Sequence, residues 1–593
     1  MTRFFLLPLS LLLSLAPLAS AAEAVLASGT AGAARWEVTC PFDNLPSVGF
    51  VPVTVTATNG SPRKTTAEYE ISSTQGYYGG ATSLLASGSL DLQPGKPATA
   101  THWIWRSTSY GSDHNNSFVS FSINTPTGNS SDTLGHGSGM ITQVAVSDTV
   151  VKAEGQFFRQ QRGQLTSRSF GIALTVFEPD SLPADWRIFS SISGIFLTPE
   201  DWDELSPGVR DAMRTWIGFG GSLRIMSVDE ADRERVAKEV APSGAELGVF
   251  ANATPVRTLH FSRFEEEFAN LISNNHLAFA VGVPPSDVTA RRPYSRYSYS
   301  EYRERRKNKF PPRDKFGPRG IPYFIICMLL IIFAIVVGPV SLFLWAGPGK
   351  RHRLFFTVPV FSLSTSGLLL LVMIFQDGLG IDGRRFVLLD LATANSSQTD
   401  AIIYQEQFTR AGMIGGGGFE VEEGLLPLVE EEAMEEGLAL RDGRAIGSWF
   451  SSRRDRSLTL AGAVPVRWQV THEGASEDSL RLRVESPITK FETAWFVDDS
   501  QQVWAWDRNP PDSDGVYTFI PASHNPASVM SPMFKECSDD LRKHVLDRMK
   551  QRNQRNRFWA LSKDAGEAAR TTHPKVDWLG STLVLTSKVV PKT

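Results

Sequence analysis

Two long apolar runs in the middle of the chain dominate its pattern of hydrophobic and polar positions. They cover Ile321–Trp345 and Leu354–Phe375, and neither contains a charged residue. A helix of about 20 apolar residues is long enough to cross a hydrocarbon core of roughly 30 Å. The pattern therefore predicts a hairpin of two transmembrane helices, at 321–345 and 354–375. The short connection at 346–353 contains the basic stretch Lys350-Arg351-His352-Arg353, which favours a cytoplasmic loop.

The N-terminus has the features of a secretory signal peptide. Arg3 precedes an apolar stretch from Phe4 to Leu18 that is short for a membrane span, and Ala19-Ser20-Ala21 supplies the small residues of a cleavage site. We expect a signal peptide at 1–21, with an uncleaved anchor as the alternative. Export of the N-terminus would place both large soluble regions outside the cytoplasm.

The region 22–160 has the alternating pattern of β-strands. Val51–Thr58 alternates apolar and hydroxyl residues and ends at the turn pair Asn59-Gly60, and Ala98–Trp105 is a second strand-like stretch. Short strands separated by Gly, Pro, Asn and Ser predict an N-terminal β-sandwich. Aromatic side chains such as Trp36 are expected in its core rather than on a ligand platform.

A helical period appears within the region 161–288. Gly194–Leu197 and Ser222–Met226 have the composition of buried strands. Between them, Ser206 and Pro207 mark the start of a helix that we expect to end at Gly218. Strand, helix, glycine turn and strand predict a βαβ unit and therefore an α/β module.

The region 376–593 returns to strand-like patterns. Stretches such as Thr493–Val497 and Val503–Trp506 predict a C-terminal β-rich domain, and Cys537–Arg552 has the spacing of an amphipathic helix. Because the second apolar run would return the chain to the outer side, this domain is expected to be exported as well. The fold class expected for the whole chain is a multidomain α+β membrane protein.

A basic linker at 289–320 connects the α/β region to the first apolar run. Within it, Arg291–Arg319 has 11 basic residues against 3 acidic ones, a net charge of +8, with four tyrosines interleaved. Arginine and tyrosine together favour contact with anionic headgroups or polyanions, and a solvated tether is the alternative. The residues assigned to this anionic-surface contact are Arg291, Arg292, Arg296, Arg303, Arg305, Arg306, Lys307 and Lys309.

Composition changes this picture little. The chain has 593 residues, a formal net charge of −4 and three cysteines, of which Cys327 lies in the first apolar run. Cys40 and Cys537 lie in the two exported regions and would be able to pair, but a sequence does not establish the distance between them. The net charge points to no particular partner, and nucleic acid is not expected in this compartment.

Sequence motifs for cofactors and catalytic metals are absent. Gly415–Gly418 lacks the Gly-Lys-Ser/Thr ending of a phosphate loop. The glutamates between 420 and 436 lack the spacing of a calcium loop, and we interpret them as a solvated charged face or as a docking contact for the basic linker. Neither His-Glu-x-x-His nor Cys-x-x-Cys occurs in the chain. We therefore expect no cofactor and no metal.

One part of the sequence resembles a known module. Ile195–Pro207 forms an acidic turn before a helix, and Thr215–Leu223 contains the Trp-x-x-x-Gly-Gly ending of that helix. This resembles the class I glutamine amidotransferase-like module of uncharacterised bacterial two-transmembrane envelope proteins, which also have a Gly-Pro pair in the first membrane helix, as at Gly338-Pro339 here. The resemblance implies a flavodoxin/amidotransferase-like fold for 161–288 and a location in the bacterial inner membrane.

The sequence departs from active amidotransferases in its cysteines. Such enzymes need a cysteine nucleophile on a strand-to-helix elbow, with a histidine and an acidic partner. No cysteine occurs between Cys40 and Cys327, so we interpret His260 and His276 as ordinary histidines. The resemblance then implies a non-catalytic envelope scaffold or binding subunit, whose partners are the bilayer and other membrane or envelope proteins. An exported hydrolase with an unrecognised site and an accessory subunit of a transporter are the alternatives, and the oligomeric state is open.

Overall fold

The computed structural model describes the two soluble regions and two helices between them. The described residues are 24–46, 49–75, 82–106, 116–138, 142–158, 172–240, 256–264, 266–267, 316, 323–345 and 354–591, the last range with gaps at 392–398, 413–416, 429–438, 523–527, 547–554 and at a few single or paired positions. The expected signal peptide and the expected loop 346–353 lie outside these residues. The chain divides into two compact units, Met1–Ser243 with Thr254–Ala280 and Gly244–Ala253 with Val281–Thr593.

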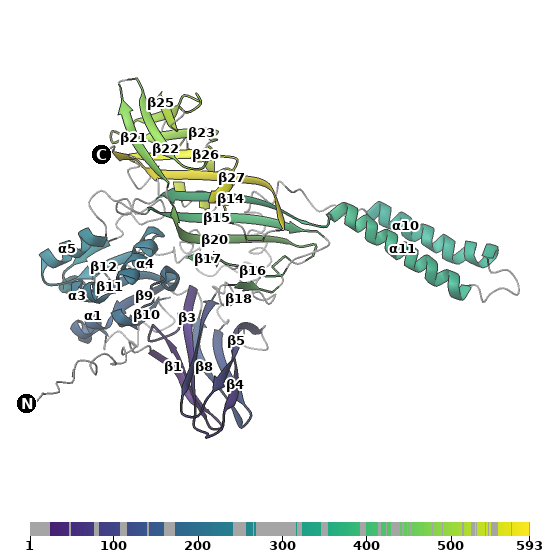
Figure 1. Ribbon diagram of the computed structural model, residues 1–593, viewed down its shortest axis with the longest axis horizontal. Coiled ribbons are helices and arrows are strands. Elements are labelled where there is room, and N and C mark those ends of the chain that lie inside the picture. The colour runs from purple at the N-terminus through teal and green to yellow at the C-terminus, as the bar shows by residue number, and fades with distance from the viewer. Residues whose placement is uncertain are drawn as a thin grey trace, which may run out of the picture. The chain divides into compact units, whose positions relative to one another are not determined.

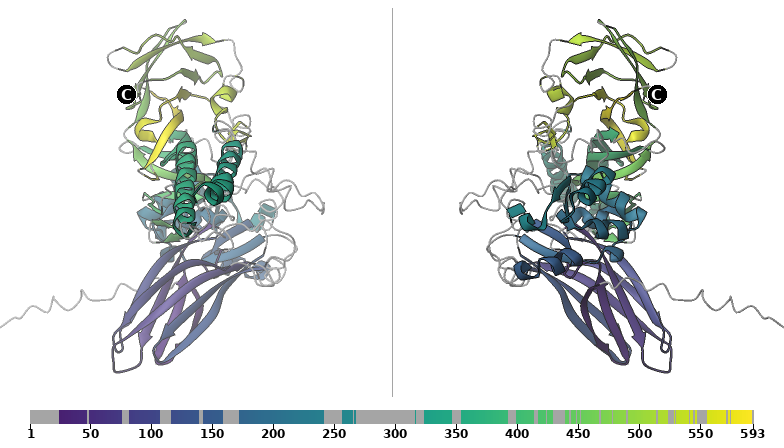
Figure 2. Two further views of the ribbon diagram at one scale, coloured as in Figure 1. Left: turned by 90° about the vertical axis from the view of Figure 1, so that its right-hand side faces the viewer. Right: turned by 90° about the vertical axis from the view of Figure 1, so that its left-hand side faces the viewer.

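Two four-stranded antiparallel sheets form the N-terminal part of the first unit, with the orders β1-β2-β3-β6 and β5-β4-β7-β8. Their strands are β1 Ala24–Ala31, β2 Ala34–Cys40, β3 Gly49–Asn59, β4 Thr65–Gln75, β5 Thr82–Leu92, β6 Pro97–Arg106, β7 Asn116–Thr125 and β8 Gly128–Ser138. The rings of Trp36 in one sheet and Phe121 in the other are 4.9 Å apart, so the sheets pack face to face (Figure 2). Trp36 is buried in this core, as predicted.

Five parallel strands form a separate sheet in the same unit, in the order β10-β9-β11-β12-β13 (Figure 1). The strands are β9 Thr142–Ser147, β10 Ile172–Phe177, β11 Ile192–Leu197, β12 Ser222–Met226 and β13 Val256–Leu259, and the helices beside them are α1 Asp148–Ala153, α3 Pro199–Glu204, α4 Pro207–Gly218 and α5 Glu230–Val240. Because β9 precedes residue 160, the parallel sheet begins inside the segment that the sequence assigned to the β-sandwich. The six residues of β9 are too short a pattern to reveal which sheet they join.

Helix α4 follows its local sequence closely. Ser206 caps the helix by accepting the N–H of Val209 at 3.4 Å, and Pro207 occupies the first turn. Trp216 near the end of the helix is buried, and its indole N–H donates to the carbonyl oxygen of Ile192 at 3.0 Å. This hydrogen bond fixes α4 against the start of β11. The helix ends at Gly218, as predicted.

Two apolar helices lie side by side in the second unit (Figure 1). Helix α10 (Tyr323–Ile335) continues as the π-helical segment η5 (Val336–Trp345), and α11 covers Leu354–Asp377. Pro339 lies within η5 and has no N–H to donate, which accounts for a change of helical winding at this point. Both helices are long and apolar enough to span a membrane, and large side chains such as Phe324 and Phe355 are 80% exposed.

A twelve-stranded sheet is the largest element of the second unit, in the order β17-β20-β15-β14-β27-β26-β23-β24-β25-β22-β21-β28. Its strands are β14 Ile381–Leu391, β15 Thr399–Ala411, β17 Leu425–Leu428, β20 Asp455–Val466, β21 Gln469–Ala475, β22 Leu480–Glu485, β23 Thr493–Val497, β24 Val503–Trp506, β25 Val516–Ala522, β26 Arg557–Ser562, β27 Val576–Lys588 and β28 Val590–Pro591. A small sheet, β16-β19-β18, comprises Phe419–Glu420, Arg444–Ile446 and Ala439–Arg441. The strand-rich, multi-sheet organisation expected from the sequence is thus confirmed.

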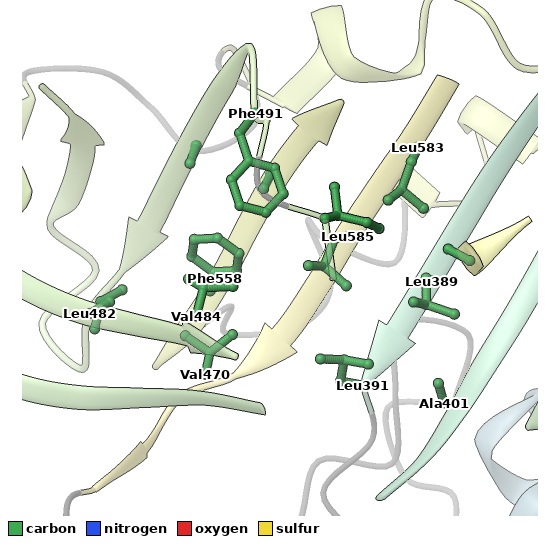
Figure 3. Packing of buried hydrophobic residues seen from close by; sticks show 14 of the residues in the cluster. Leu389, Leu391, Ala401, Val470, Leu482, Val484, Phe491, Phe558, Leu583 and Leu585 are labelled. Carbon is green, nitrogen blue, oxygen red and sulfur yellow. The ribbon is translucent and has the colours of Figure 1, made fainter. Parts of the chain in front are cut away.

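One hydrophobic core gathers residues from distant strands of this sheet. Leu389 of β14 and Leu585 of β27 share a cluster with Leu482 of β22 and Phe558 of β26 (Figure 3). Sheets of more than about ten strands tend to curl. Because strands from the middle and from one end of the order contribute to the same core, the sheet curves around it.

The opposite face of β14 contains a buried ion pair. Asp390 alternates with the core residue Leu389, and Arg557 of β26 donates to its carboxylate at 3.0 Å. The two side chains are 0% and 3% exposed, and Arg557 also donates to Thr586 at 3.2 Å. A charged pair therefore lies inside the domain, between strands that are far apart in the sequence.

The cysteines are thiols and form no disulfide. Cys40 and Cys537, whose pairing the sequence left open, are each a buried thiol within their own compact unit. Burial, together with the nearby Glu406 carboxylate, raises the pKa of Cys537 above its usual value and keeps the thiol protonated. The described residues between 539 and 546 are helical, in agreement with the helix predicted there, and Glu406 accepts the N–H and hydroxyl of Ser538 at its start.

Candidate site at the root of the helical hairpin

The anionic-surface contact predicted from the sequence lies outside the described residues. Of the linker 289–320, only Phe316 is described, so the eight basic residues assigned to that contact remain a prediction. Phe316 itself is held firmly by the sheet of the second unit. Sequence reasoning missed this contact, because a single aromatic residue in a charged linker does not reveal its partner.

Phe316 packs among side chains of β14 and β15. Its ring lies 5.2 Å from the ring of Phe408, and the guanidinium groups of Arg410 and Arg384 lie 5.1 and 5.9 Å from its centre. Arg410 also donates to the carbonyl oxygen of Phe316 at 3.0 Å and to both oxygens of Asp455 at 3.0 and 3.1 Å. These five residues are called the hairpin root below.

The start of α10 and the end of α11 are each only a few residues along the chain from the hairpin root. Phe316 precedes the start of α10 at Tyr323, and β14 begins at Ile381, shortly after α11 ends at Asp377. Gly378, with φ of +72°, ends α11 and donates its N–H to Ile374. Four residues span at most about 14 Å. The start of β14 therefore lies close to the end of α11 whatever the direction of the helices.

A second arginine–aromatic contact lies on the other face of β14. Arg385 stacks over Trp578 of β27 at 4.6 Å and donates to Ser581 at 2.7 Å. Burial lowers the pKa of Arg385, an effect that the carboxylate of Asp564 opposes. Neighbouring strand residues point to opposite faces of a sheet. Arg384 and Arg385 therefore each place a guanidinium over an aromatic ring, one on each face.

The carboxyl edge of the parallel sheet is a second place to look for a site. In open α/β sheets, ligands bind where the strand order reverses, which here is between β9 and β11. At this point Asp201 is 1% exposed and accepts the hydroxyl of Ser147 at 2.5 Å and the N–H of Thr198 at 2.8 Å. Thr198 in turn accepts the N–H of Asp201, which completes a capping box. These polar groups join the ends of the two strands to each other.

Replacing Asp201 should therefore destabilise the first unit rather than change a reaction. Asp201→Ala removes the acceptor of two buried donors, and we expect a loss of about 3 kcal/mol in the free energy of unfolding. Denaturant unfolding of the detergent-solubilised chain, followed by tryptophan fluorescence, measures it. Asp203→Ala is the matched control, because Asp203 lies in the same helix and its side chain forms an exposed pair with Arg235. That change should cost less than about 1 kcal/mol, and equal losses for both variants would contradict the assignment.

Within the described residues, the strand-to-helix turn and the histidine that the amidotransferase resemblance singles out are placed as follows. The strand-to-helix turn after β12 exposes Val228, which is 71% exposed and has no nucleophilic atom. His260 accepts the N–H of Ser262 at 3.2 Å and contacts its hydroxyl at 2.9 Å, a local cap at the start of a short helical turn. His276 lies outside the described residues.

A cavity of about 620 Å³ lies beside α5 and β13, lined by charged side chains that include Lys238, Arg257 and Glu267. Glu267 accepts from Arg224 at 2.9 Å and from Arg257 at 3.1 Å. Burial lowers the pKa of Arg224 to about 10, and the nearby carboxylate of Glu267 opposes this shift. Within the residues that the structure describes, no group of three metal-ligating side chains occurs.

The acidic and glycine-rich segments of the second unit are only partly described. Glu422 forms an ion pair with Arg570 at 3.2 Å, and Glu420 lies in β16. Gly418 packs so tightly against the backbone of Ala445 that a side chain would overlap it. This close packing gives one glycine of the Gly415–Gly418 run a structural role. The other glutamates between 420 and 436 lie outside the described part of the chain.

Comparisons with known proteins identify no family. No family model and no curated protein matches the chain. Among solved structures, β-glucuronidase 2 of Bacteroides uniformis is 9% identical, with a TM-score of 0.13 over 41% of this chain and 31% of that one. A β-glucuronidase of Parabacteroides merdae is 8% identical, with a TM-score of 0.13 over 93% of this chain and 77% of that one. Likeness at this level carries no argument about fold or function.

Proposed function

We propose that this protein is a non-catalytic scaffold or binding subunit of the bacterial envelope, anchored in the inner membrane by a hairpin of α10, η5 and α11. A signal peptide at 1–21 exports the N-terminus, and both soluble regions then lie on the outer side. Their partners are other membrane or envelope proteins. The observation that carries the proposal is the pair of long apolar helices, most of whose large side chains are exposed although they are apolar.

The proposed scaffold contains a flavodoxin/amidotransferase-like module. Its support is the parallel strand order β10-β9-β11-β12-β13. In this order β9, the first strand of the sheet along the chain, lies between the second, β10, and the third, β11, as in flavodoxin-like sheets. Support for a binding rather than a catalytic role comes from the carboxyl edge of this sheet. There Ser147, Thr198 and Asp201 are engaged in hydrogen bonds that hold the strands together.

Membrane fractionation tests the anchor. The full chain should remain in the membrane pellet after washing with alkaline carbonate. Replacing Ile331, Ile332, Phe361 and Leu363 by arginine should release it, because these residues lie near the centres of the two candidate spans and each charge there costs about 2.5–3.5 kcal/mol on insertion. Ile520→Arg is the control, since Ile520 is 47% exposed on a strand and its replacement should leave the chain in the pellet. Extraction of the unaltered chain by carbonate would contradict the anchor.

Labelling of intact cells tests the topology and the scaffold role. An impermeant reagent applied after permeabilising only the outer membrane should label lysines in both soluble regions, such as Lys64 and Lys543. Labelling of only one region would overturn the arrangement in which both regions lie on the outer side. Co-purification in mild detergent should then recover the same membrane or envelope partners with the unaltered chain and with Asp203→Ala. A hydrolytic activity of the purified chain would instead support the alternative of an exported hydrolase.

A further inference from the structure

We propose that the end of the twelve-stranded sheet at the hairpin root binds the headgroups of anionic phospholipids, through the arginines Arg453 and Arg454 and the flanking Arg384 and Arg385. This proposal rests on the proposed membrane crossing and adds a lipid specificity to it. It concerns folded residues of the second unit and does not use the eight basic residues of the linker 289–320 that the sequence assigned to an anionic surface.

Covalent connection fixes where this end of the sheet lies. Only Gly378, Leu379 and Gly380 separate the end of α11 from the start of β14. If α11 spans a bilayer, Ile381 lies within about 14 Å of the end of the span. The N-terminal end of α10 belongs to the same side of the hairpin, and Phe316 connects it to the hairpin root. This end of the sheet therefore faces the membrane surface.

Backbone hydrogen bonds hold Arg453 and Arg454 at that end. Gly412 donates to Gly380 at 2.7 Å, Arg453 donates to Gly412 at 2.9 Å, and Ala411 donates to Arg454 at 3.0 Å. Arg453 adopts a left-handed backbone conformation with φ of 59°, which turns the chain sharply beside Gly412. Both arginine side chains are exposed. The turn that presents them is thus tied to the residues that leave the helix.

The chemistry of this end suits a lipid surface. Two exposed leucines accompany the arginines: Leu379, 50% exposed after α11, and Leu579, 52% exposed at the irregularity between β27 and β14. Trp578, with Arg385 over its ring, lies next to Leu579. Tryptophan and arginine at the boundary of a membrane place apolar and charged groups at the depth where headgroups begin. A phosphate group accepts the fork of hydrogen bonds that a guanidinium donates.

Hydrogen–deuterium exchange of the full chain in lipid nanodiscs tests the proposal. Discs of phosphatidylcholine are compared with discs that also contain phosphatidylglycerol. Amide exchange of the peptide that spans 452–456 should be slower in the anionic discs by about fivefold for each arginine, the factor that corresponds to about 1 kcal/mol per basic residue at an anionic surface. High salt should abolish the difference, because it screens exposed charges.

A charge-reversed variant and a matched control complete the test. Arg453→Glu with Arg454→Glu should remove the difference between the discs. Arg508→Glu with Arg481→Glu should keep it, because Arg508 is also exposed with φ of 65° but lies beyond β24, four strands from β14. Equal exchange in both discs would overturn the headgroup contact alone, whereas failure to enter discs would overturn the membrane crossing. Slower exchange with inorganic phosphate in neutral discs would overturn the assignment to lipid.

Discussion

Asp390→Ala should lower the free energy of unfolding of the second unit by about 3–5 kcal/mol, the largest loss expected in this protein from removing one charge. The change leaves the guanidinium of Arg557, 3% exposed, without the carboxylate that it contacts at 3.0 Å. An uncompensated charge inside a protein is costly because desolvation is no longer offset by attraction. Denaturant unfolding of the detergent-solubilised chain, compared with the unaltered protein, measures the loss.

Two controls separate the missing charge from the missing packing. Asp512→Ala breaks the exposed pair with Arg481, whose side chains are 62% and 52% exposed, and should cost less than about 1 kcal/mol. Replacing Asp390 by Leu and Arg557 by Met together removes both charges and should recover most of the lost stability. If the double replacement were as unstable as Asp390→Ala, packing rather than charge would explain the effect.

Trp216→Ala should destabilise the first unit by a similar amount, about 3–5 kcal/mol, because it empties a large buried volume. Trp216 is 1% exposed, its ring lies 5.8 Å from that of Phe189, and its indole N–H donates to Ile192 at 3.0 Å. A side chain on Gly221 would overlap the indole, so Trp216 and Gly221 form one packing unit. The Trp-x-x-x-Gly-Gly pattern thus has a structural explanation in this chain.

Unfolding of the first unit, measured by urea titration of the detergent-solubilised chain, checks this expectation. Gly221→Val should also be destabilising, since the new side chain meets the indole ring, and combining it with Trp216→Ala should cost less than the sum of the two changes. Val228→Ala is the control, because Val228 is 71% exposed and should change stability by less than about 0.5 kcal/mol. Additive losses for Trp216 and Gly221 would contradict their direct contact.

Local patterns in the sequence predicted many elements closely. Ser206, Pro207 and Gly218 bound α4 as expected, because capping and helix termination depend on side chains within the helix itself. Thr493–Val497, Val503–Trp506 and Ser222–Met226 are strands with the predicted ends. The two long helices also follow from composition, except that Pro339 changes the winding of the first one.

Other features depend on contacts between distant residues and were not visible in the sequence. A short buried strand such as β9 fits either an antiparallel or a parallel sheet, and only the strand order shows that it joins the parallel one. Asp390 appears in the sequence as one charged residue in an apolar strand, and its partner is 167 positions away. Phe316 likewise shows its role only beside Arg384 and Arg410.

The sequence by itself determined the elements of this protein and the two apolar helices, because capping, alternation and apolar length are properties of neighbouring residues. Only the tertiary structure decided the order of the strands and the burial of Cys40 and Cys537 as thiols. It also decided the hydrogen bonds that join Asp201 to Ser147 and Thr198, and the contacts of the hairpin root. Each of these depends on which distant segments meet, and that is set by the packing of whole sheets around their cores rather than by any local pattern.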